Sequence, residues 1–329
     1  MQTTFQTHNS IGTVAAAARH PDVRPPTLPE FLQRRADNVG QMPRLNGAFG
    51  NDSTSQPNPT LGSTKVHYAK VEGELFGDKG PKLGNIDQGN LGDCFFLASV
   101  GAVVADDPTA IRNAIRDNAD GTYSVRFYHD TLFGHEPVWI TVNGELPVDS
   151  NGRLAYAQGV DSDADGKLEL WVPIMEKAYA KYVDKYGADD GKSGYADIGA
   201  GGSSRAAIEA LTGRSAHFDT LPSGDAKLES MLSAANDGRQ VVVSTKDKGA
   251  DGWVGHHAYT VVGTYEKDGE TMVMLRNPWG STEPDAADKG KKANDGLFSV
   301  SLDELRKHVR GVSSNEPASS FIDLLRSLF

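Results

Sequence analysis

The chain has 329 residues, of which 38% are hydrophobic and 23% charged, and its formal net charge is −11. An acidic balance without a basic stripe excludes a nucleic-acid binder that relies on phosphate contacts. The single cysteine excludes an internal disulfide bond, and no apolar run approaches the roughly 18 residues of a membrane span. The N-terminus also lacks the basic and apolar regions of a cleaved signal peptide. We therefore expect a cytoplasmic protein, or one exported without a cleaved signal peptide.

Residues 1–64 are rich in Pro, Asn, Ser, Gln and Thr, as in "NDSTSQPNPT". A segment of this composition buries too little apolar surface to offset the entropy that it loses on ordering. We therefore expect residues 1–64 to form a mostly disordered N-terminal segment.

The stretch from residue 65 to residue 198 predicts mostly helices. After Cys94 the apolar run "FFLASVGAVVA" has the length of a helix, and Asp107 followed by Pro108 marks the start of the next one. The alternating stretches "TYSVRFYH" and "EPVWITV" predict two strands. "ELWVPIMEKAYAKYVDKY" carries apolar residues at three- and four-residue spacing, which predicts a long amphipathic helix.

The glycine-dense stretch "GADDGKSGYADIGAGGSS" predicts a hinge between two lobes. Beyond it two helices end at Gly213 and Gly238, followed by the strands "QVVVST", "HHAYTVVGTYE", "TMVMLRN" and "LFSVSL". We therefore predict an α+β chain with a cleft between its lobes. Its expected parts are a helical first lobe over residues 65–198, a β-rich second lobe over residues 199–312, and a short tail over residues 313–329.

The only cysteine stands where a glycine-rich, polar stretch turns into an apolar run, in "DQGNLGDCFFLASV". A thiol is nucleophilic as a thiolate, and a helix N-terminus favours that form. If Cys94 opens the helix, its backbone N–H can hold a developing oxyanion, and the Gln88 side chain can be the second donor. This stretch alone leaves an alternative open, in which Cys94 is a small buried hydrophobe.

The stretch "GHHAYTVVGTYEKDGETMVMLRNPWG" predicts a strand, a turn and a returning strand. An antiparallel hairpin brings a histidine at its start beside Asn277 at its end. The side-chain carbonyl of Asn277 can accept the ring N–H of that histidine and orient it as a general base, and Trp279 can shield this hydrogen bond from water. We expect His256 and His257 to be neighbours on a strand, so that their side chains face opposite ways and only one can enter the cleft.

Four separated motifs resemble the calpain family of papain-fold, calcium-dependent cysteine proteases: "QGNLGDCFFLAS", "LWVPIMEKAYAKYV", "GHHAYTVVG" and "LRNPWG". The resemblance covers roughly residues 66–312 and implies a papain-like, two-lobed protease core without the further domains of the larger animal calpains. It implies Cys94 as the nucleophile and His257 as the general base and acid. It also implies Asn277 as the residue that orients this histidine, and Gln88 as the oxyanion donor. The predicted function is a cysteine endopeptidase that acts on proteins or peptides.

The resemblance also implies calcium, because calpain-type cores bind this ion in each lobe. Glu176 matches a ligand in the first lobe, and Asp295 matches one in the second. The family's acidic residue upstream of the cysteine is replaced here by Asn85, and an acidic position in the second lobe is replaced by Leu297. Phe95 also stands where calpains usually carry Trp. We therefore expect weakened calcium sites at these positions.

The stretch "DSDADGKLEL" opens like an EF-hand calcium loop, with Asp161, Asp163 and Asp165 at alternate positions before Gly166. The bidentate Glu expected at the twelfth loop position is absent, because Val172 stands there. The pattern predicts weak calcium binding by the three aspartates, and an acidic, metal-free turn is the alternative.

Two other functions stay open. One is a catalytically inactive module that binds peptides in its cleft, although the chain carries all three residue types of a Cys–His–Asn triad. The other is a papain-fold acyl transferase or deamidase, although such enzymes commonly have Asp where Asn277 stands.

Overall fold

The computed structural model describes residues 57–132, 134–187, 191–221, 224–289 and 294–316. Residues 1–56 of the predicted N-terminal segment and residues 317–329 of the predicted tail lie outside these ranges.

Helices and strands alternate along the first part of the chain, and strands dominate the second. The first part contains β1 (His67–Lys70), η1 (Leu83–Asn85), α2 (Cys94–Asp106), α3 (Pro108–Ala114), β2 (Ile115–Asp117), β3 (Thr122–Thr131), β4 (Gly134–Asn143), β5 (Glu145–Val148), α4 (Trp171–Tyr186) and α5 (Gly194–Ile198). The second part contains α6 (Ser204–Thr212), β6 (Ala216–Thr220), α7 (Asp225–Ser233), η2 (Ala234–Asp237), β7 (Val241–Thr245), β8 (Ala258–Lys267), β9 (Glu270–Arg276), β10 (Leu297–Ser301), α8 (Leu302–His308) and β11 (Val309–Asn315).

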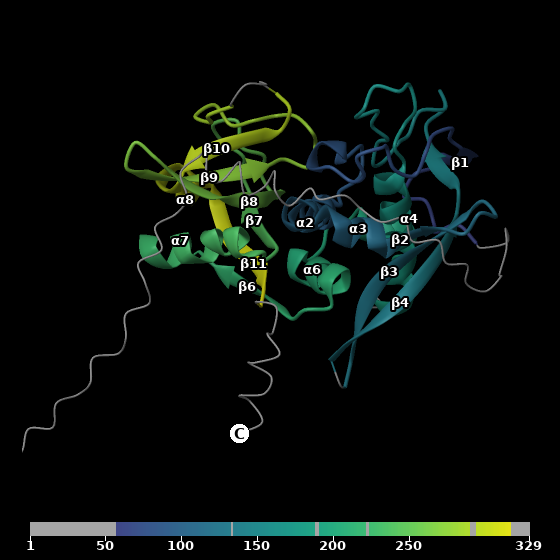
Figure 1. Ribbon diagram of the computed structural model, residues 1–329, viewed down its shortest axis with the longest axis horizontal. Helices are drawn as coiled ribbons and strands as arrows, with labels where there is room; N and C mark the ends of the chain where they lie inside the picture. The colour runs from purple at the N-terminus through teal and green to yellow at the C-terminus, as the bar shows by residue number, and fades with distance from the viewer. Residues whose placement is uncertain (1–56, 133, 188–190, 222–223, 290–293, 317–329) are drawn as a thin grey trace, which may run out of the picture.

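The strands pair antiparallel in three sheets, with the orders β1-β5, β2-β3-β4 and β10-β9-β8-β7-β11-β6. In Figure 1 the sheet β2-β3-β4 lies with α3 and α4 on one side of the molecule, and the six-stranded sheet lies with α7 and α8 on the other. Helix α2 lies between the two groups. This arrangement confirms the predicted α+β class.

Helix α2 packs between the two groups, and it can be buried on all sides because its residues are almost all apolar. Every residue from Phe95 to Val104 is buried. On the second-lobe side, the Thr260 hydroxyl of β8 donates to the Ala98 carbonyl over 2.7 Å. Gly101 makes this approach possible, since a Cβ there would lie 2.4 Å from the Thr260 hydroxyl oxygen. The N-terminal end of α2 is therefore held against β8.

Two apolar cores flank α2, and α6 contributes to their junction. In the first core, Phe96 of α2 stacks on Tyr179 of α4 with ring centroids 3.9 Å apart. The second core lies under the six-stranded sheet and includes Tyr259 of β8. On α6, Ala207 joins the first core, whereas Ile208 packs in a small cluster with residues of α2, β7 and β8. The helix that the sequence assigned to the second lobe is thus shared by both lobes.

Part of the glycine-dense stretch, in which the sequence predicts a hinge, forms a short helix. Residues 194–198 form α5, and Tyr195 is fully buried in the first core. The Gly194 N–H also donates to the Asp184 carboxylate of α4. These contacts fasten this part of the stretch to the first lobe.

Within the described part of the chain, no single helix has the length and apolarity to cross a membrane. Only α2 and α3 taken together reach that threshold, and they are bent by 117° relative to each other.

Candidate active site

Cys94 is the first residue of α2, as its position before an apolar run predicted. Asp93 is the N-cap residue, but its side chain makes no capping hydrogen bond. The Cys94 side chain is partly buried and packs against Ala258, whose backbone N–H hydrogen-bonds the sulfur. The thiol of the first lobe therefore lies directly beside the peptide that joins His257 to β8.

His257 and Asn277 lie at neighbouring ends of two paired strands. His257 directly precedes β8 and Asn277 directly follows β9, and antiparallel pairing sets Thr260 opposite Arg276. The ring nitrogen Nε2 of His257 lies 2.8 Å from Oδ1 of Asn277. Asn277 is fully buried, and its Nδ2 donates to the Thr282 carbonyl over 2.9 Å. The hairpin thus holds the amide with its oxygen toward the imidazole.

The Asn277 contact fixes which nitrogen of His257 carries the proton. An amide oxygen only accepts hydrogen bonds, so Nε2 is the protonated nitrogen and Nδ1 is left as the base. The Trp279 ring lies 4.8 Å and the Tyr259 ring 4.9 Å from the imidazole, centroid to centroid. These rings shield the His257–Asn277 hydrogen bond from water, as expected for Trp279.

Burial sets the charge state of both reactive groups. It lowers the pKa of His257 to about 4, although the hydrogen bond to Asn277 acts in the opposite direction. It raises the pKa of Cys94 to about 11, against the effect of the Ala258 N–H. At neutral pH these pKa values leave both the Cys94 thiol and the His257 imidazole neutral in the free protein.

His256 lies apart from this site. Its backbone has φ 48°, and its exposed ring makes an ion pair of 3.6 Å with Asp247. The strand begins at Ala258, so a turn rather than strand alternation separates the two histidines.

Gln88 lies upstream of Cys94 in a loop that is tied to the second lobe. Its backbone N–H donates to the Pro278 carbonyl over 2.8 Å, and its side-chain Nε2 donates to the Leu91 carbonyl. The Gln88 side chain also hydrogen-bonds the Asp93 carboxyl group. Gln88 also lines a surface pocket of about 390 Å³; the other lining residues are Gly89, Asn90, Leu91, Trp279 and Ser281.

Comparison with known proteins agrees with this geometry. The sequence profile of the family described as "Calpain family cysteine protease" matches residues 67–296. The chain belongs to the calpain family. It is 30% identical over 270 residues to the calpain-type cysteine protease DEK1 of Arabidopsis thaliana, covering 72% of this chain and 11% of that protein. It is 28% identical over 258 residues to Calpain-8 of Mus musculus, covering 68% of this chain and 34% of that protein. The matched part of the chain thus spans 11% of the length of the first relative and 34% of the second.

Two contacts of this calpain-family site escaped the sequence analysis. Asp93 and Glu176 are both almost fully buried, and their carboxyl groups interact beside the start of α2. Burial raises the pKa of Asp93, and burial together with the Asp93 charge raises the pKa of Glu176 well above its usual range. Each of the two carboxyl groups therefore favours its protonated form more than a solvated carboxyl group does. No sequence pattern links residues so far apart.

The second contact is made by Arg276, the last residue of β9. It is 4% exposed, and its Nη2 donates to the Ile86 carbonyl of the first lobe over 3.1 Å. Its Nη1 donates to the Asp295 carbonyl of the second lobe. A charged residue that ends an apolar strand just before Asn277 was the signal that could have pointed to it.

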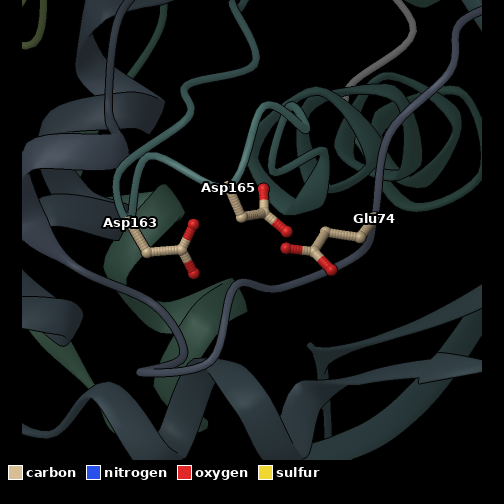
Figure 2. A group of neighbouring side chains, drawn as sticks. All are labelled: Glu74, Asp163 and Asp165. Carbon is tan, nitrogen blue, oxygen red and sulfur yellow. The ribbon is translucent and has the colours of Figure 1, made fainter.

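The predicted metal ligands fall in three separate places. Glu176 accepts the Ala157 N–H over 3.1 Å beside Asp93, and Asp295 accepts the Leu297 N–H over 3.0 Å. Asp163 and Asp165 lie together, as predicted, and Figure 2 shows them beside a third carboxylate, that of Glu74. Among the described residues, these three are the one group of acidic, histidine or cysteine side chains within reach of a common metal ion.

The third predicted aspartate, Asp161, is not part of this group. Its carboxylate accepts the Gly166 N–H over 3.0 Å.

Proposed function

We propose that this protein is a cysteine endopeptidase in which Cys94, His257 and Asn277 form the catalytic triad. The observation that carries the proposal is the 2.8 Å hydrogen bond between His257 and Asn277, at a site where the Cys94 sulfur contacts the Ala258 N–H. Membership of the calpain family supports a protein substrate. The thiol at a helix N-terminus is the nucleophile, and the oriented imidazole is the base.

The first half of the reaction forms a thioester. As the sulfur attacks the peptide carbonyl, Nδ1 of His257 takes the thiol proton, because both groups start neutral. The oxyanion accepts hydrogen bonds from the Cys94 N–H at the start of α2 and from Gln88 Nε2, which turns one hydrogen toward it from Asp93. The imidazolium then gives its proton to the amine nitrogen, the C–N bond breaks, and the amine product leaves.

The second half of the reaction hydrolyses the thioester. His257 takes a proton from water, whose oxygen attacks the acyl carbon. The same two donors hold the second oxyanion. The C–S bond then breaks, the carboxylic acid product leaves, and the sulfur recovers its proton from the imidazolium. Throughout, Asn277 stabilises the imidazolium and keeps Nδ1 pointing at the reacting atoms.

No step of this mechanism uses calcium. The family resemblance implies one ion in each lobe, with Glu176 as a ligand in the first and Asp295 in the second. Among the described residues, neither carboxylate lies in a group of three acidic, histidine or cysteine side chains within reach of one ion. Arg276 and the Gln88 backbone join the two lobes through protein hydrogen bonds alone. We propose that the lobes are aligned for catalysis by these contacts.

The products formed from a reduced, unfolded test protein decide between the candidate functions. The expected result is new peptide N-termini inside that protein, detected by mass spectrometry. Glutamine side chains converted to glutamate or joined to amines would show a deamidase or transferase instead. Peptide retention without any covalent change would show a binding module.

Gln88→Ala is expected to lower kcat by a factor on the order of 10²–10³ with little change in KM, because it removes one oxyanion donor. The measurement is steady-state hydrolysis of a fluorogenic peptide. Asn90→Ala is the matched control, since it removes an exposed amide side chain from the same pocket and should leave kcat unchanged. Equal losses in both variants would show that the pocket, and not the Gln88 amide, matters.

A further inference from the structure

The acidic cluster, Glu74, Asp163 and Asp165, joins two segments of the first lobe that are far apart in sequence. One carboxylate oxygen from each residue lies within 4.8 Å of the others. In Figure 2 the carboxylate of Asp165 points toward that of Glu74, and Asp163 lies to the left of both. The backbone fixes this arrangement, because Glu74 exchanges hydrogen bonds of 2.8 Å with Leu168 and Leu170. The three carboxylates are thus held together by the fold.

The cluster has one cation for three carboxylates. The Lys167 ammonium lies 2.8 Å from Asp165 and 3.6 Å from Glu74. Its side chain is 57% exposed, so it can swing into water at little cost. The Oδ2 of Asp163 accepts the Asp78 N–H over 3.0 Å, and its solvent-shielded Oδ1 has no hydrogen-bond partner within the described part of the chain.

A buried carboxylate beside the cluster, that of Glu169, is a second observation that points to a cation-binding site. Glu169 is 1% exposed, and its Oε1 accepts hydrogen bonds from Ser162. Its Oε2 is shielded from solvent and finds no hydrogen-bond partner among the residues that the structure describes. A Cβ on Gly77 would lie 2.7 Å from Glu169 Oε1 and 2.6 Å from Asp163 Oδ2. Both carboxylates therefore lie close to this glycine and to each other. Burying a carboxylate with a free oxygen is costly unless a cation neutralises it.

We propose that Glu74, Asp163 and Asp165 bind a calcium ion, with Glu169 completing the site from its buried side. Calcium accepts six to eight oxygen ligands at roughly 2.3–2.6 Å in flexible geometry, whereas magnesium demands a tighter octahedron at about 2.0–2.1 Å. Carboxylate oxygens spread over as much as 4.8 Å suit the larger ion. On binding, Lys167 leaves the cluster. Asp161 shapes the loop through its bond to Gly166 and is not a ligand.

The ion would join the segment that contains Glu74, which leads to the active-site loop, to the segment that contains Asp163 and Asp165. Glu74 precedes the loop that carries Gln88, and Lys82 on the way donates to the Ser162 hydroxyl over 2.6 Å. Calcium therefore stabilises the first lobe outside the reacting centre. This site and the proposed peptidase activity stand on different residues and can fail separately.

The test uses the full chain with Cys94→Ala, which cannot digest itself, so binding is read without activity. We expect calorimetric titration with CaCl₂ to show one site with a Kd on the order of 10⁻⁵–10⁻³ M, together with a higher Tm at saturation. Asp163→Asn and, separately, Glu169→Gln should each weaken binding by about 10-fold or more. Lys167→Ala should tighten it.

Asp161→Asn is the matched control, since it changes a neighbouring aspartate of the same loop and should leave Kd within about twofold if Asp161 is no ligand. Each variant's Tm without calcium shows whether it still folds. The proposal is overturned if calcium gives no heat and no Tm shift, or if magnesium binds as tightly as calcium. It is also overturned if Asp161→Asn weakens binding as much as both Asp163→Asn and Glu169→Gln do.

Discussion

We expect Cys94→Ala to lower kcat for peptide hydrolysis by a factor on the order of 10⁶, the size of effect seen when a triad loses its nucleophile. The chain has no second cysteine to take over the attack on the carbonyl carbon. The fold should survive, because the side chain packs among small residues such as Ala98 and Ala258. The measurement is single-turnover cleavage of an unfolded protein, with the circular dichroism spectrum as the check on folding.

Labelling with iodoacetamide is the companion to this result. Wild type should take one label, at Cys94, and lose activity in proportion to labelling. Retention of more than a hundredth of the wild-type rate by a folded Cys94→Ala protein would contradict the proposed nucleophile. Activity that survives complete labelling would do the same.

The sequence was enough to predict the parts of the site that depend on residues close together in the chain. The change from polar to apolar residues at Cys94 predicts the first residue of α2, and the structure begins the helix there. The hairpin pattern predicts that a histidine and Asn277 meet, because antiparallel pairing of two consecutive strands needs only a short turn. The choice of His257 over His256 came from the family resemblance, since the positive φ of His256 leaves no pattern in the residue types.

The parts that depend on long-range packing could not be predicted. Asp93 meets Glu176 only because α2 and α4 pack in one core, and Glu74 reaches Asp163 only through backbone pairing near Leu168. Glycine density also gave no sign that part of this stretch holds a buried Tyr195 and a short helix. Burial by distant segments decided each of these outcomes.

We expect His257→Ala to lower kcat by a factor on the order of 10⁴–10⁶, because the thiol then has no base and the leaving amine has no acid. The neighbouring histidine gives an unusually close control. His256 is exposed and pairs with Asp247, so His256→Ala should keep the wild-type kcat and KM. A comparable loss in both variants would mean that the turn before β8, rather than the imidazole at position 257, limits the reaction.

The pH profile of the wild type tests the same residue without a substitution. Burial lowers the pKa of His257 to about 4, so the free enzyme keeps its base as the pH falls below 6 and loses kcat/KM only as the imidazole gains a proton near pH 4. Burial also raises the pKa of Cys94 to about 11, so the neutral pair persists across the range between and the profile is a broad plateau. An acid limb near 6.5, the value of a solvated histidine, would show that water reaches the ring and that Trp279 and Tyr259 do not shield it.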